Sequence, residues 1–176
     1  IHSRGADSSP YEYGQSGAYD LKAIMDVADR ASSLDSKHTE SLIKDLSHKD
    51  SAARYWAAMG LLMREKAGIA AGRNALRSAL NDEAAPAKII AAQALAQWGD
   101  EEDSKLAIPV LLELAPIDQN DVYTSMLALN ALDAMGARAT VVAEQLAKMP
   151  KDGKVPPRMG AYVKNLLTKI LDDLKQ

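Results

Sequence analysis

Three segments of this 176-residue chain repeat one another: residues 54–61 (RYWAAMGL), 88–95 (KIIAAQAL) and 125–132 (SMLALNAL). The first two begin 34 residues apart, and the last two begin 37 residues apart. A period of this length is typical of solenoids, in which pairs of helices stack on their neighbours and bury a continuous core. The sequence therefore predicts an all-α fold, an α-solenoid of helix pairs that winds into a right-handed superhelix.

The composition agrees with helices and excludes several kinds of site. Alanine is abundant, there is no Phe, and no run of strand-forming residues alternates in polarity. The formal net charge is -3 with both signs interspersed, so the chain offers no basic patch for nucleic acid. The absence of Cys removes disulfides, thiolate nucleophiles and Cys-based metal sites. No apolar run approaches the roughly 20 residues that span a membrane, and no signal peptide is visible.

The first nineteen residues differ from the rest. Residues 1–19 are rich in Gly, Ser and Pro, which predicts an irregular linker or docking segment. They also carry three tyrosines, whose rings suit contact with another surface, either this chain's own first helix or a preceding domain. Residues 20–176 are then expected to form the helical-repeat domain, with one leading helix and about four helix pairs. Because the chain opens with Ile1, we expect a fragment or a processed form.

Helix starts and ends are marked in the sequence. Asp20, Asp50 and Asp121 precede apolar-periodic segments and are predicted N-caps, whose carboxylates accept hydrogen bonds from first-turn amides. Pro86 is expected in the first turn of a further helix, where no amide hydrogen is needed, and Pro109 is expected early in the next one. In the last helix, apolar residues at helical spacing between positions 163 and 174 face away from a polar side, which suits the end of a stack.

The repeated helices share a pattern of small residues, and the positions that the pattern leaves free are predicted to face outward or lie at the rim. Seven of these nine free positions are apolar, which we name the apolar ladder: Tyr55, Trp56, Met59, Ile89, Ile90, Met126 and Leu127. An exposed patch of that size indicates a docking surface, with Tyr11 and Tyr13 as further interface candidates. The alternative is that the helical phase is shifted by one residue, so that half of these side chains belong to the core.

Catalytic and metal-binding patterns are not found. The three histidines do not form a metal-ligand spacing such as HExxH. Residues 100–103 (DEED) and 118–121 (DQND) lack the glycine and distal glutamate of a calcium loop, so capping of helices is the favoured role. With no phosphate-binding glycine loop and no nucleophile elbow, we predict no catalytic residue, no cofactor and no metal site.

Several segments resemble one family: residues 1–4 (IHSR), 10–14 (PYEYG), 31–35 (ASSLD), 50–64 (DSAARYWAAMGLLMR) and 128–136 (ALNALDAMG). They are similar to the C-terminal region of bacterial sulfatases, of the arylsulfatase and N-sulfoglucosamine sulfohydrolase type, that carry HEAT-like repeats after the catalytic domain. The resemblance implies an exported parent enzyme, periplasmic or secreted. The family's nucleophile lies in a C/S-x-P-x-R motif, whereas residues 8–12 (SSPYE) end in Glu12, so no catalytic residue carries over.

Three functions follow as expectations. The first is a non-catalytic C-terminal domain that braces or docks on a sulfatase catalytic domain of the same polypeptide. The second is a free-standing HEAT-repeat scaffold that binds another protein. The third is an accessory module for a sulfated glycan, although such a site needs a groove lined by Lys and Arg, and the basic residues do not cluster in that way.

Overall fold

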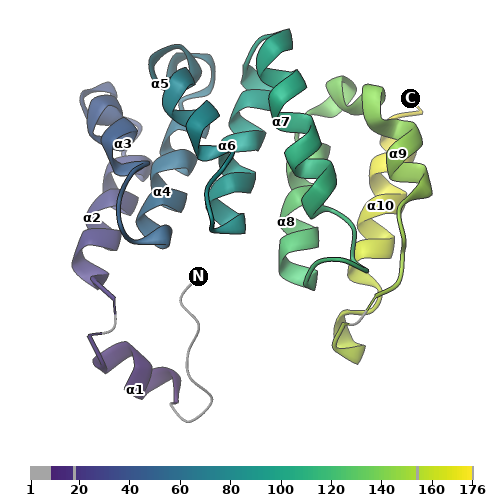
Figure 1. Ribbon diagram of the computed structural model, residues 1–176, viewed down its shortest axis with the longest axis horizontal. Coiled ribbons are helices and arrows are strands. Elements are labelled where there is room, and N and C mark those ends of the chain that lie inside the picture. Colours follow the sequence, from purple (N-terminus) through teal and green to yellow (C-terminus); the bar gives the residue numbers. More distant parts are fainter. Residues whose placement is uncertain (1–8, 18, 154, 176) are drawn as a thin grey trace.

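The structure, a computed structural model, describes residues 9–17, 19–153 and 155–175. Throughout that part of the chain the regular elements are helices and no strand is present, which confirms the all-α prediction (Figure 1). The α-helices are α1 (Pro10–Gln15), α2 (Leu21–Ser32), α3 (Thr39–Asp45), α4 (Ser51–Leu62), α5 (Glu65–Ala79), α6 (Ala85–Trp98), α7 (Glu101–Leu114), α8 (Val122–Asp133), α9 (Ala143–Lys148) and α10 (Tyr162–Asp173). Three 3-10 helices join them: η1 (Ser36–His38), η2 (Gly136–Val142) and η3 (Pro157–Met159).

The helices form two layers (Figure 1). The even-numbered helices from α2 to α10 lie side by side in the lower layer, and α3, α5, α7 and α9 lie above them. Helix α4 packs against α2 and α6, while α8 packs against α6 and α10. The three repeated segments lie in α4, α6 and α8, so they occupy neighbouring places in one layer. Helix α1 lies below α2, apart from both layers.

The predicted N-caps are confirmed. One carboxylate oxygen of Asp20, of Asp50 and of Asp121 accepts a hydrogen bond from a first-turn amide, at 2.9, 2.8 and 2.9 Å. These bonds satisfy amides that have no partner inside the helix, which is why α2, α4 and α8 begin where they do. In Figure 1 the loops from the upper layer reach the lower ends of α4, α6 and α8, so these three helices begin at the same edge.

The core runs through both layers and is densest around α6. This helix packs against α4, α5, α7 and α8. Eight of its residues are buried, most of them alanine: Ala87, Ile89, Ile90, Ala91, Ala92, Ala94, Leu95 and Ala96. Small side chains let the neighbouring helices approach from several directions, and α6 therefore has almost no free apolar face.

Charge pairs join successive parts of the stack. Arg54 of α4 donates two hydrogen bonds to Asp82, in the loop before α6, at 2.6 and 2.8 Å. Arg77 of α5 donates to Asp103 of α7 at 2.7 Å, and the Asp103 side chain is fully buried. A buried carboxylate is tolerated because it is paired and hydrogen-bonded.

Two local expectations differ from the structure. Residues 10–15 form the short helix α1 rather than irregular chain, because Ser9 and Glu12 cap it reciprocally: the Ser9 amide donates to the Glu12 carboxylate, and the Glu12 amide donates to the Ser9 hydroxyl. Pro109 lies in the second half of α7, not near its start, because that helix already begins at Glu101 behind the Asp100 cap.

Among the described residues, no single helix is long and apolar enough to cross a membrane. Only the pair Val122–Asp133 and Gly136–Lys148 reaches that length and composition together, and the chain bends by 113° between the two parts.

Candidate functional site

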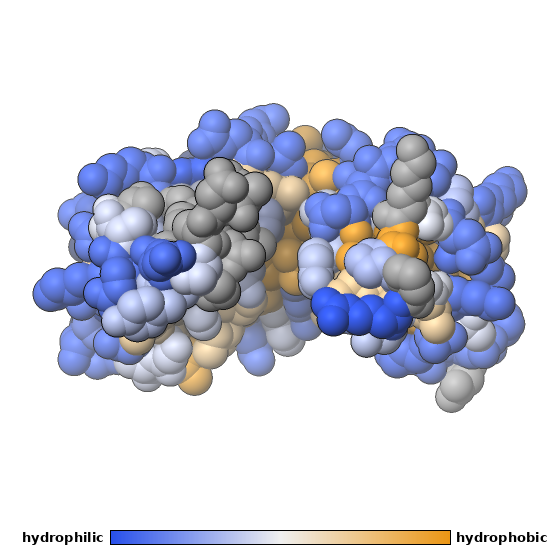
Figure 2. All heavy atoms as spheres, turned by 90° about the horizontal axis from the view of Figure 1, so that it is seen from below, coloured by the Kyte–Doolittle hydropathy of each residue, from blue (hydrophilic) through white to orange (hydrophobic). Residues whose placement is uncertain are grey.

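A groove lies where α4, α6 and α8 begin, and we name it the cap-edge groove. Its volume is about 670 Å³. Its lining comes from three helix starts: Ser51, Ala52 and Tyr55 from α4, Glu83 to Pro86 at the start of α6, and Asp121, Tyr123, Thr124 and Leu127 at α8. Figure 2 shows this side of the molecule, where apolar atoms lie in a hollow between two polar masses.

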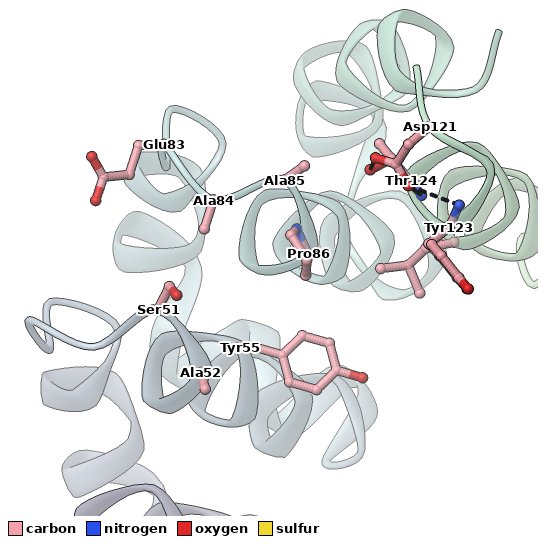
Figure 3. A pocket seen from close by; sticks show the side chains of 11 residues that line it. Ser51, Ala52, Tyr55, Glu83, Ala84, Ala85, Pro86, Asp121, Tyr123 and Thr124 are labelled. Carbon is pink, nitrogen blue, oxygen red and sulfur yellow. Dashed lines mark hydrogen bonds between the residues drawn. The ribbon is translucent and has the colours of Figure 1, made fainter. Parts of the chain in front are cut away.

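Two tyrosines flank the groove (Figure 3). The Tyr55 ring extends from α4 past Pro86 towards α8, and Tyr123 projects from α8. Tyr55 is half-buried and packs edge-on against Trp56, with ring centroids 5.7 Å apart, and burial raises the pKa of its phenol. Tyr123 is 66% exposed. The first ring is therefore fixed by packing, whereas the second is available to a bound molecule.

Carboxylates lie at the helix starts that border the groove. Asp50 and Asp121 cap α4 and α8, whereas α6 has no side-chain cap, and Asp82 Oδ1 instead accepts the amide hydrogen of Ala84, just before that helix, at 2.8 Å. Burial would raise the pKa of Asp82, but hydrogen bonds from Arg54 and from the Ala84 amide outweigh it, so that pKa lies below its ordinary value. These three carboxylates offset the positive ends of the helix dipoles.

Charge at the rim is negative. The Glu83 side chain is 90% exposed, and its carboxylate lies 3.6 Å from Arg54 Nη2. Burial would raise the pKa of Asp121, but hydrogen bonds from Thr124 and from the Tyr123 amide outweigh it and keep that pKa low. Among the described residues that line the groove, none is Lys or Arg. The groove thus combines apolar and aromatic walls with carboxylates at its mouth.

The apolar ladder is only partly on the surface. Tyr55 and Leu127 line the groove and are partly buried against the core, and their role as interface residues stays a prediction. The prediction that Ile89 and Ile90 face outward is wrong, because their side chains are 0% and 2% exposed. Helix α6 has neighbours on several sides, so positions that are free in the repeat pattern are core positions there. Partly buried ladder residues that pack against the core are Trp56, Met59 and Met126.

The N-terminal tyrosines are only partly described. Tyr11 is 76% exposed on α1, so in this structure its ring does not cover the first long helix. The side chain of Tyr13 lies outside the described residues. Their role as interface residues stays a prediction.

The two ends of the helical stack differ in polarity. At the N-terminal end, α2 exposes Leu21 (54%) and Met25 (51%), one helical turn apart, and Leu34 is 54% exposed just beyond α2. At the C-terminal end, the solvent side of α10 is largely polar, apart from Tyr162 at its start, with exposed Lys164, Asn165, Thr168, Lys169, Asp172 and Asp173. The polar face predicted for the last helix is confirmed.

The groove residues that were not foreseen include Glu83, Pro86 and Tyr123. Each lies at the start of a helix that carries a repeated segment: Pro86 and Tyr123 are in first turns, and Glu83 is two residues before α6. Aligning the repeats on their starts, rather than on their apolar positions, would have indicated that these residues share one edge.

The acidic residues at positions 100–103 act on the start of a helix. Asp100 and Asp103 form a reciprocal capping box at α7, which confirms the capping role expected for residues 100–103. Among the described residues, no group of three or more His, Asp or Glu side chains is placed to hold a metal ion. No family model matches the sequence, and a search of curated proteins finds no match either.

Proposed function

We propose that this chain is a non-catalytic, HEAT-like helical-repeat domain, an α-solenoid, that docks through its N-terminal end on another folded domain. The observation that carries this proposal is the difference between the two ends of the stack. Repeat proteins need a polar outer face on a terminal repeat that meets water. Helix α10 has such a face, whereas α2 exposes Leu21 and Met25.

The resemblance to sulfatase C-terminal regions names the domain that would cover α2. It would be a sulfatase catalytic domain that precedes this chain in the same polypeptide, in a periplasmic or secreted enzyme. The helical domain would then brace the catalytic domain without contributing a reacting group. Residues 9–17 and 19–20, which lead into α2, would lie at the junction.

The second candidate, a free-standing protein-binding scaffold, is favoured by the cap-edge groove, which lies away from the N-terminal end. The third candidate, a sulfated-glycan module, gains nothing from this groove, since the described residues that line it include carboxylates and no cationic side chain.

The test starts from the coding sequence upstream of Ile1 in the source genome. We expect a C/S-x-P-x-R motif in the same reading frame. The domain that carries it, expressed separately, should bind the chain in isothermal titration calorimetry. Met25→Glu should weaken that binding about 10-fold or more, because burying a Met side chain is worth about 1.5–3 kcal/mol.

The matched control is Asn165→Glu, a similar added charge on the exposed side of α10. It should leave the affinity unchanged. The proposal fails if the upstream frame holds no such domain, or if Met25→Glu and Asn165→Glu weaken binding equally.

A further inference from the structure

We propose that the cap-edge groove binds an extended segment of a partner protein in which basic side chains alternate with apolar ones. This site is separate from the N-terminal end that carries the proposed docking function. It rests on the shape of the groove, on its charge and on its two tyrosines.

The shape favours an extended chain. The groove crosses the starts of three neighbouring helices, and packed helices lie about 8–10 Å apart, so it spans roughly 20 Å. An extended segment of about six residues has that length, at roughly 3.3 Å per residue. The middle is low because Ala84 and Ala85 at the start of α6 contribute only methyl groups, and there a backbone can approach closely (Figure 3).

The charge favours a cation over an anion. Three converging helix starts would ordinarily attract an anion through their free amides. Here Asp50 and Asp121 already accept hydrogen bonds from the first turns of α4 and α8. Helix α6 has no side-chain cap, but Pro86 in its first turn has no amide hydrogen, and Asp82 accepts the amide hydrogen of Ala84 just before it. An anion would therefore meet carboxylates at this edge and few free donors. Glu83 adds a further carboxylate at the mouth and is 90% exposed. A basic side chain complements this edge.

The tyrosines favour a segment of mixed character. Tyr55 and Tyr123 stand on two of the three helices, and the faces of their rings attract Lys or Arg side chains. Pro86 and Leu127 supply apolar surface between and beside them. In an extended chain, successive side chains point to opposite sides, so alternating basic and apolar residues reach both kinds of surface.

The experiment titrates the whole ¹⁵N-labelled chain at low salt with an unlabelled, end-capped octapeptide of sequence ALKLKLKA, in which basic and apolar side chains alternate. Binding is followed by amide chemical shifts, and we expect the largest shifts at residues 51–55, 83–87 and 121–127. The acidic peptide ALELELEA, tested in the same way, should bind at least 10-fold more weakly.

Variants assign the contacts. Tyr123→Ala should weaken binding of the basic peptide about two- to fivefold, which corresponds to an exposed cation–π contact, while Tyr123→Phe keeps the ring and the affinity. Glu83→Lys should weaken binding further and reduce its salt dependence. Tyr11→Ala is the matched control, since Tyr11 is also exposed but lies outside the groove, and it should have no effect.

Four results would overturn the proposal. The first is no shift at about 2 mM basic peptide, and the second is a set of shifts centred away from the groove. The third is equal or tighter binding of ALELELEA, which would indicate an anion site. The fourth is a concentration-dependent dimer that Glu83→Lys abolishes in analytical ultracentrifugation, which would make a second copy of the chain the occupant.

Discussion

The pair formed by Arg54 and Asp82 should be the most sensitive polar contact between the first two helix pairs. Their side chains are 11% and 6% exposed, and two hydrogen bonds of 2.6 and 2.8 Å join them. Arg54 Nη1 also donates to the backbone oxygen of His48 at 2.9 Å. The substitution Asp82→Ala removes the anion and leaves the guanidinium buried beside backbone oxygens.

The magnitude follows from that burial. Removing one partner of a buried ion pair costs about 3–5 kcal/mol when the remaining charge has no other partner. Arg54 keeps a second carboxylate, that of Glu83 at 3.6 Å, but Glu83 is 90% exposed and compensates only weakly. The 11% exposure of Arg54 lets water reach its rim, so the lower end of the range, about 3 kcal/mol, is expected. In a chain of this length each kcal/mol lowers Tm by roughly 2–4 °C, so the expected drop is about 6–12 °C.

The assay is urea unfolding followed by circular dichroism at neutral pH. Asp82→Ala, Arg54→Met and the variant with both substitutions form a double-mutant cycle with the parent chain. The double variant should be more stable than the sum of the two single losses predicts, by about 2 kcal/mol or more, because it carries no orphaned charge. Glu144→Ala is the control: its pair with Lys148 is 80% and 73% exposed, and its loss should cost at most about 0.5 kcal/mol. A loss under about 1 kcal/mol for Asp82→Ala, or strictly additive single losses, would refute the reasoning.

Further predictions concern acid, two glycines and a proline. The pKa of Asp82 in the folded chain lies below its ordinary value of 3.8. The stability that this carboxylate supplies is therefore complete above 3.8 and is lost as pH falls through the lower pKa of the folded chain. The difference in urea midpoint between the parent chain and Asp82→Ala should stay constant from neutral pH down to about 5 and shrink below 3.8. Gly60→Ala should cost about 1–3 kcal/mol in the same assay, because the new Cβ would lie 3.0 Å from a backbone α-carbon of α2, which outweighs the better helix propensity. Gly72→Ala should be neutral or stabilising by up to about 1 kcal/mol, since its closest contact is the movable end of the Leu61 side chain at 2.9 Å, and a loss like that of Gly60→Ala would contradict this. Pro109→Ala should raise Tm, with a gain of about 1–3 kcal/mol, because it restores a hydrogen bond inside α7; an unchanged Tm would show that the helix already accommodates the proline.

The helix starts could be predicted from the sequence because their cause is local. Asp50 and Asp121 act on amides two or three residues away, and that relation is visible in one dimension. Burial in α6 could not be predicted in the same way. Ile89 and Ile90 occupy positions that the repeat pattern leaves free, but neighbouring helices cover them. How many helices surround α6 depends on how the whole chain packs, which the pattern of one helix does not contain.

The cap-edge groove was missed for a related reason. Its members come from three helix starts, and Tyr55 and Tyr123 are far apart in the sequence. What brings them together is the side-by-side packing of α4, α6 and α8, each entered from the same side. Of the interface candidates proposed from sequence, Tyr55 and Leu127 lie in the groove, whereas Asp121 was considered only as a cap and Glu83 was not considered.

The central place of α6 has a consequence for the order in which the backbone opens. Helix α6 packs against α4, α5, α7 and α8. Helix α1 lies outside the two layers, and α10 packs against α8 and α9 at one end of the molecule. In hydrogen–deuterium exchange, amides of α1, α2 and α10 should become labelled through local fraying, while those of α6 should exchange only when the whole chain unfolds. Structure would therefore be lost from both ends inward, with α6 the last helix to melt.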